Sequence, residues 1–163
     1  MEKSQINAII KFCKTSFAMN YEKMKAYAGW FVQDNTTYVT DGYRMYAFED
    51  IDLPKDLCAD QYVHNATIDR MNCQNTFESI CKECKHTINL PKIKDIKDYM
   101  KTYKLCPYNL GDENQPHYFN PKYLIELIQA TGGGGEFIIG DRWNSPLVYQ
   151  DNEMKALLLP MRK

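Results

Sequence analysis

Long hydrophobic runs are missing from this chain of 163 residues, and their absence excludes several classes of protein. No apolar run approaches the length of a membrane span. The first ten residues, MEKSQINAII, become polar within a few positions and lack the apolar core of a signal peptide. Six cysteines without an export signal are more typical of thiols or metal ligands than of disulfides. The sequence therefore predicts a soluble, cytoplasmic protein with no membrane partner.

An excess of charge of either sign is also missing. The 20 basic and 21 acidic side chains leave a formal charge of -1, so nucleic-acid binding would need a local basic face. Catalytic patterns are equally scarce: His64, His86 and His117 stand in no recognisable relation to a nucleophile or to paired carboxylates. The glycine run at 132–135 is not followed by the lysine of a phosphate-binding loop. We therefore expect a binding protein and not an enzyme.

Helical and strand patterns follow one another in an order that predicts an α+β fold. Apolar residues at helical spacing predict helices at 4–18, 90–103 and 121–131, the second with Pro91 at an early helical position. Strand patterns lie at 24–33, 37–48, 136–140, 146–150 and 155–159, and Asp41-Gly42 supplies the turn of the 37–48 hairpin. The length suits a single domain of helices packed on antiparallel strand meanders. An irregular, cysteine-bearing stretch at about 55–117 is interpreted as an insertion into that domain.

A CxxC pair in this insertion raises the question of a metal. Cys81 and Cys84 have the spacing that lets two thiolates reach one tetrahedral zinc ion, and the shell would be completed by Cys73, His86 or Cys106. A strong zinc-site pattern contains a second pair of this kind, and this sequence has none. A redox-active CxxC pair and reduced, partly buried thiols remain the alternatives, and no other cofactor is expected.

Two of the predicted helices carry lysines beside their apolar stripe. These lysines form either a solvated face of the helix or a surface that binds a phosphate backbone, and the sequence leaves both open. The candidate DNA-binding lysines are Lys3, Lys11 and Lys14 on the first helix and Lys94, Lys97 and Lys101 on the second.

Three segments resemble, in order, pieces of the bacterial DNA polymerase III beta sliding clamp family: TDGYRM at 40–45, FNPKYLIELI at 119–128 and LPMRK at 159–163. Each clamp domain also has a helix, a strand meander, a second helix and another meander. The resemblance covers residues 1 to about 53 and 118 to 163. Tyr43 replaces a usual histidine, Leu159 a usual methionine and Lys163 a usual aliphatic residue. A clamp chain has three such domains, whereas this chain has room for one.

The resemblance implies a peptide-binding pocket, because these segments of the family receive short linear peptides from polymerases and repair proteins. Met45, Leu157 and Met161 would give an adaptable apolar floor, Pro160 a rigid wall and Arg44 a charged rim. The alternative is that the same residues only cap the sheet edge and fill the core. The implied pocket residues are Thr40, Gly42, Tyr43, Arg44, Met45, Leu157, Pro160 and Met161.

Two functions follow from the resemblance. The first is a sliding-clamp-like DNA replication protein that binds duplex DNA without sequence specificity, its lysine-bearing helices facing the duplex in a homo-oligomeric ring. The second is a monomeric interaction or regulatory module that keeps the peptide pocket, with or without a zinc-stabilised insertion, and does not encircle DNA.

Overall fold

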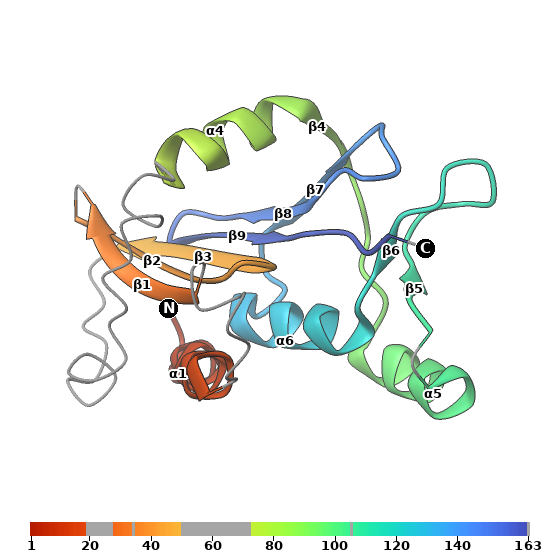
Figure 1. Ribbon diagram of the computed structural model, residues 1–163, viewed down its shortest axis with the longest axis horizontal. Coiled ribbons are helices and arrows are strands. Elements are labelled where there is room, and N and C mark those ends of the chain that lie inside the picture. Colours follow the sequence, from red (N-terminus) through yellow and green to blue (C-terminus); the bar gives the residue numbers. More distant parts are fainter. Residues whose placement is uncertain (19–27, 34, 50–72, 105, 163) are drawn as a thin grey trace.

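A seven-stranded antiparallel sheet, a two-stranded sheet and four helices make up the described part of the chain (Figure 1). The computed structural model describes residues 1–18, 28–33, 35–49, 73–104 and 106–162, without the side chains of 13–18, 28–33 and 73–74. The predicted α+β class is confirmed. The elements are α1 (Lys3–Ala18), β1 (Ala28–Gln33), β2 (Thr36–Asp41), β3 (Arg44–Glu49), α4 (Cys73–Glu83), β4 (Cys84–Thr87), α5 (Ile93–Tyr103), β5 (Tyr108–Asn109), β6 (Tyr118–Phe119), α6 (Pro121–Thr131), β7 (Glu136–Gly140), β8 (Leu147–Gln150) and β9 (Met154–Leu158).

The strand order β1-β2-β3-β9-β8-β7-β4 joins two meanders side by side. The first meander, β1 to β3, meets the second, β7 to β9, through antiparallel pairing of β3 with β9, in which Arg44 lies opposite Leu158. β4 comes from the middle of the chain and pairs with β7 at the edge of the sheet. The predicted insertion therefore contributes a strand to the main sheet.

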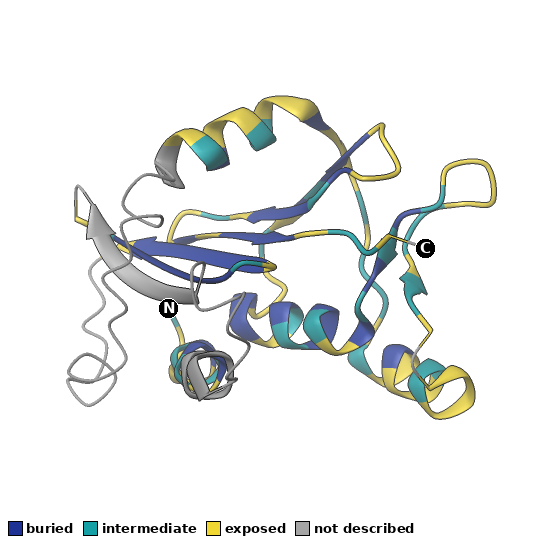
Figure 2. Cartoon of the chain, in the orientation of Figure 1, coloured by how far each residue is buried: buried dark blue, intermediate teal, exposed yellow. Residues whose placement is uncertain are grey.

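Both faces of the sheet are buried by helices, and strand alternation sends neighbouring residues to different cores. Tyr46 and Phe48 join Leu124 and Leu127 of α6 in the larger core, which also receives α1 and α5. Met45 and Ala47 face the opposite side, where Phe77 of α4 covers them. The helices α1, α6 and α5 lie below the sheet in the view of Figure 1, and α4 lies above it. Buried residues follow β2, β3, β7, β8 and β9 and the sheet-facing side of α6 (Figure 2).

The helix α6 forms where local chemistry predicts it. The Asn120 side chain accepts hydrogen bonds from the backbone N–H groups of Lys122 and Tyr123, and Pro121 occupies the first turn. Gly132 ends the helix with a φ of 68°, a conformation that glycine adopts without steric cost. Both ends of the helix are therefore encoded by residues at or next to those ends.

Several elements differ from the sequence prediction. The stretch at 73–87, expected to be irregular, forms α4 and β4, and the pair β5 and β6 was not predicted. α5 begins at Ile93, so Pro91 precedes the helix instead of lying within it. Residues 24–27 of the first predicted strand lie outside the described ranges. No helix in the ranges given above combines the length and the apolarity needed to cross a bilayer.

Candidate functional site: the surface formed by the hairpin turn and the C-terminal segment

The β2–β3 turn is held by the side chains of its own sequence. Gly42 has a φ of 83° and occupies the turn with Tyr43, whereas Asp41, expected in the turn, is the last residue of β2. Thr40 Oγ1 accepts the N–H of Gly42 at 3.1 Å. Asp41 Oδ1 accepts the N–H groups of Tyr43 and Arg44 at 3.0 and 2.8 Å. The TDGYR segment therefore encodes a preorganised turn.

Arg44 anchors this turn to two helices. Arg44 Nε and Nη2 donate to Asp41 Oδ2 at 3.1 and 2.7 Å, and Arg44 Nη1 donates to Glu126 of α6. Its guanidinium carbon lies 4.5 Å from the centroid of the Phe12 ring and 3.8 Å from that of Tyr123. Burial lowers the pKa of Arg44, but the charges of Asp41 and Glu126 contribute to a net increase. Arg44 is 3% exposed, so the expectation of a charged rim was wrong.

The C-terminal segment runs past the turn and is tied to it by the backbone. The N–H of Leu159 donates to the carbonyl of Tyr43 at 2.9 Å, and the N–H of Met161 donates to the carbonyl of Tyr118 at 2.7 Å. The Tyr43 ring lies 6.1 Å from that of Tyr123, between centroids. Tyr43 is 46% and Leu159 37% exposed, while Pro160 and Met161 are half-buried. We call this surface, formed by Tyr43, Tyr123, Leu159, Pro160 and Met161, the turn–tail surface.

Only part of the predicted pocket lies on the turn–tail surface. Tyr43, Pro160 and Met161 lie on it and Gly42 stands next to Tyr43 in the turn, whereas Thr40 is buried in β2. Met45 and Leu157 lie opposite one another in the core under α4, so they do not form the expected floor. Tyr123 was not predicted as a site residue, although it stands in the FNPKY segment that carries the resemblance.

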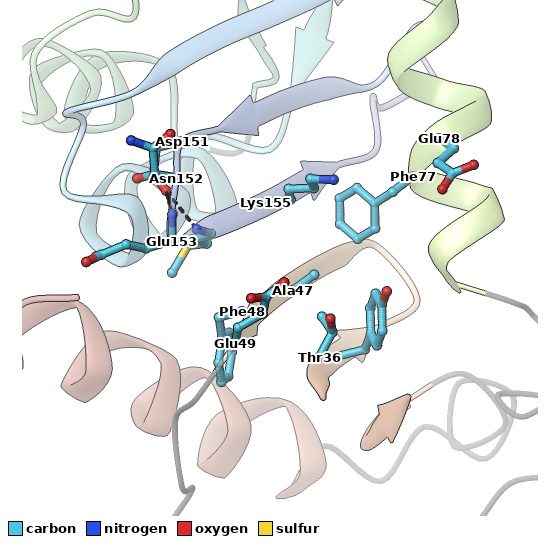
Figure 3. Close-up of a pocket in the computed structure, with 12 residues that line it drawn as sticks. Thr36, Ala47, Phe48, Glu49, Phe77, Glu78, Asp151, Asn152, Glu153 and Lys155 are labelled. Carbon is cyan, nitrogen blue, oxygen red and sulfur yellow. Dashed lines mark hydrogen bonds between the residues drawn. The ribbon is translucent and has the colours of Figure 1, made fainter. Parts of the chain in front are cut away.

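A cavity of about 300 Å³ lies between α4 and the far ends of β2, β3 and β9 (Figure 3). The rings of Tyr38 and Phe77 lie 6.4 Å apart there, between centroids. Asp151 accepts the backbone N–H groups of Glu153 and Met154, and Lys155 extends toward Phe77. The cavity is at the Glu49 end of β3 and the turn–tail surface at the Arg44 end, so the two are separate features.

Cys81 and Cys84 of the predicted zinc site lie at the junction of α4 and β4, whereas Cys73 is the first residue of α4. Burial, followed by the nearby Cys81 and Glu83, raises the pKa of Cys84 to about 11, and its thiol donates to the carbonyl of Pro146 at 3.7 Å. Burial likewise raises the pKa of Cys81. His86 contacts Asp141 instead. Within the described ranges no three His, Cys, Asp or Glu side chains are grouped as metal ligands, and the side chain of Cys73 lies outside them.

The predicted DNA-binding lysines lie on helices of one side of the sheet. Lys3 and Lys11 of α1 and Lys94 and Lys97 of α5 are exposed. Lys101 is also exposed and forms an ion pair with Asp98 at 2.7 Å. α1 and α5 flank α6 below the sheet in Figure 1. The side chain of Lys14 lies outside the described part of the chain.

No protein-family model, curated protein or solved structure matches this chain. The likeness to the sliding clamp therefore rests on the three sequence segments and on the order of helices and meanders.

Proposed function

We propose that this chain is a non-enzymatic, single-domain relative of the sliding clamp that captures short linear peptides on its turn–tail surface. The observation that carries the proposal is the hydrogen bond from the Leu159 N–H to the Tyr43 carbonyl. It joins the two segments whose sequences resemble the peptide-binding parts of the clamp. In a clamp chain these segments belong to different domains, and here one domain supplies both.

The chemistry of the turn–tail surface suits a peptide ligand. Exposed Tyr43 and Leu159 offer aromatic and aliphatic area, and half-buried Met161 offers a side chain that adapts to different partners. The turn is fixed by Asp41 and Arg44 before any ligand arrives, so binding need not order it. These features support a peptide-binding function and require no catalytic group.

The test is a fluorescence anisotropy titration with a labelled peptide from the clamp-binding segment of a bacterial replicative polymerase. Tyr43→Ala and Leu159→Ala each remove an exposed side chain without opening the core. We expect each variant to weaken binding by about tenfold or more, the size of an interface anchor. Tyr103→Ala is the control, because Tyr103 is an exposed tyrosine on α5. Binding that is equally strong in both surface variants, or no weaker for a scrambled peptide, would reject the proposal.

A second candidate function, duplex DNA binding without sequence specificity, is favoured by the lysines of α1 and α5 on one side of the sheet. Affinity should then fall steeply with salt, because each phosphate contact releases counterions. Encirclement also needs a homo-oligomeric ring of about six copies, joined head to tail. Light scattering on a size-exclusion column measures the mass of the protein in solution. A mass of about six protomers supports the ring, and the mass of a monomer rejects it.

A further inference from the structure

Three tyrosines form a cluster on α5 and β5, in the middle region that the clamp resemblance leaves without a role. The ring centroid of Tyr99 lies 4.7 Å from that of Tyr103, at an interplanar angle of 36°, and 4.9 Å from that of Tyr108. The Tyr99 hydroxyl donates to the Pro107 carbonyl at 2.8 Å, which fixes the central ring. Tyr103 lies against this fixed ring and is nevertheless 55% exposed. The cluster therefore presents a supported aromatic surface to solvent.

The helix beneath this cluster lies in one of the basic stretches of a nearly neutral chain. Residues 92–104 hold five lysines and two aspartates, a surplus of three positive charges in a protein of formal charge -1. Asp98 is neutralised by its ion pair with Lys101. Asp95 lies in the first turn of α5, about 12 Å along the helix axis from Tyr103 at 1.5 Å per residue. Lys94 stands next to Asp95 and lies at a similar distance from Tyr103, whereas Lys97 of α5 and Lys104 at its C-terminal cap are nearer to the ring, so these two lysines supply the positive charge beside Tyr103.

We propose that α5 and β5 form a binding site for single-stranded nucleic acid, in which an unpaired base stacks on Tyr103 and the lysines of α5 contact phosphates. An aromatic ring next to a local positive surplus is the combination that single-strand binders use, because stacking accepts every base and lysine accepts every phosphate. The bases of a duplex are stacked on one another and cannot stack on Tyr103. The site is separate from the turn–tail surface and goes beyond peptide capture.

The experiment compares a labelled oligothymidylate of about 12 nucleotides, within the site sizes of small single-strand binders, with a duplex of equal length. Titrations of the full chain are followed by fluorescence anisotropy at two salt concentrations. We expect tighter binding of the single strand than of the duplex. Tyr103→Ala should weaken single-strand binding by about 5- to 150-fold, as expected when one base can no longer stack, and should leave duplex binding unchanged. Tyr103→Phe keeps the ring and should bind as the unmodified chain does.

The lysines have a separate readout. Replacing Lys97 and Lys104, which are exposed and seven residues apart on one stripe, by glutamine should lower the slope of log affinity against log salt by about 0.7 for each phosphate that is no longer neutralised. Tyr43→Ala is the matched control, because Tyr43 is the exposed tyrosine of the turn–tail surface. It should weaken peptide binding and leave oligonucleotide binding unchanged, and Tyr103→Ala should do the reverse, so either proposal can fail without the other. Single-strand affinity that is unchanged by Tyr103→Ala, or no tighter than duplex affinity, overturns the inference.

Discussion

Replacing Arg44 by methionine should destabilise the protein more than any exposed substitution, because Arg44 joins the β2–β3 turn to α6. Methionine keeps much of the apolar stem but cannot donate to Asp41 or Glu126. Asp41 is only 5% exposed, so in the variant its carboxylate would stay buried without the guanidinium and with little water to solvate it. We therefore expect both the turn and its contact with α6 to weaken.

The expected size follows from the burial of the pair. Removing one partner of a buried ion pair costs about 3 to 5 kcal/mol, because the remaining charge stays desolvated. The same substitution also removes the cation–π contacts of the guanidinium with the Phe12 and Tyr123 rings, which contribute about 1 to 2 kcal/mol. This energy does not simply add to that of the ion pair, because both involve the same side chain. Domains are stable by only about 5 to 15 kcal/mol. Arg44→Met should thus remove a large fraction of the free energy of unfolding.

Urea unfolding followed by circular dichroism measures this destabilisation. With a denaturant slope of about 2 kcal/mol/M, the midpoint of Arg44→Met should fall by about 2 M. Arg142→Met is the control, because Arg142 is exposed in the β7–β8 turn and forms no ion pair within the described ranges. It should change stability by less than about 0.5 kcal/mol. A destabilisation below about 1 kcal/mol for Arg44→Met would refute the reasoning, given the magnitude expected for a buried pair.

Three further predictions concern stability and reactivity. Asn120→Ala removes the cap of α6 and should cost about 1 kcal/mol in the same urea assay. Burial lowers the pKa of His117, against the opposing charge of Asp112, so the unfolded chain binds this proton more readily. Stability should therefore fall as pH drops below about 6.5. The urea midpoints of the unmodified chain and of His117→Gln should differ less at pH 5.5 than at pH 7.5. Cys84, with its pKa of about 11, should react with a maleimide far more slowly at neutral pH than exposed Cys106, as peptide mapping by mass spectrometry would show.

The parts of the fold that could be predicted from sequence are those with local signals. α6 has a capping asparagine, a first-turn proline and a terminal glycine, and each acts within a few residues of its own position. α4 has no comparable start signal in its described residues and depends on Phe77 packing against Met45 and Leu157 of the sheet. Its stripe of Phe77, Ile80 and Cys81 has helical spacing and was the available clue.

The candidate site was harder to predict because it depends on contacts between distant segments. Arg44 was expected at a rim, and its partner Glu126 cannot be identified from the neighbouring sequence. One error was avoidable: adjacent strand residues point to opposite faces, so Arg44 and Met45 could not line the same surface. The approach of the C-terminal segment to the turn was predicted only through the family resemblance. The tyrosine cluster of α5 and β5 had no local signal beyond the residues themselves.

Mapping amide chemical shifts by NMR would show whether peptides bind where the hairpin turn meets the C-terminal segment. The labelled chain is titrated with the polymerase peptide described above. We expect the largest shifts at 42–44, 118 and 159–162, with little change around the cavity beside Phe77. Shifts that cluster at that cavity, or no shifts at a large excess of peptide, would show that peptides do not bind at the turn–tail surface.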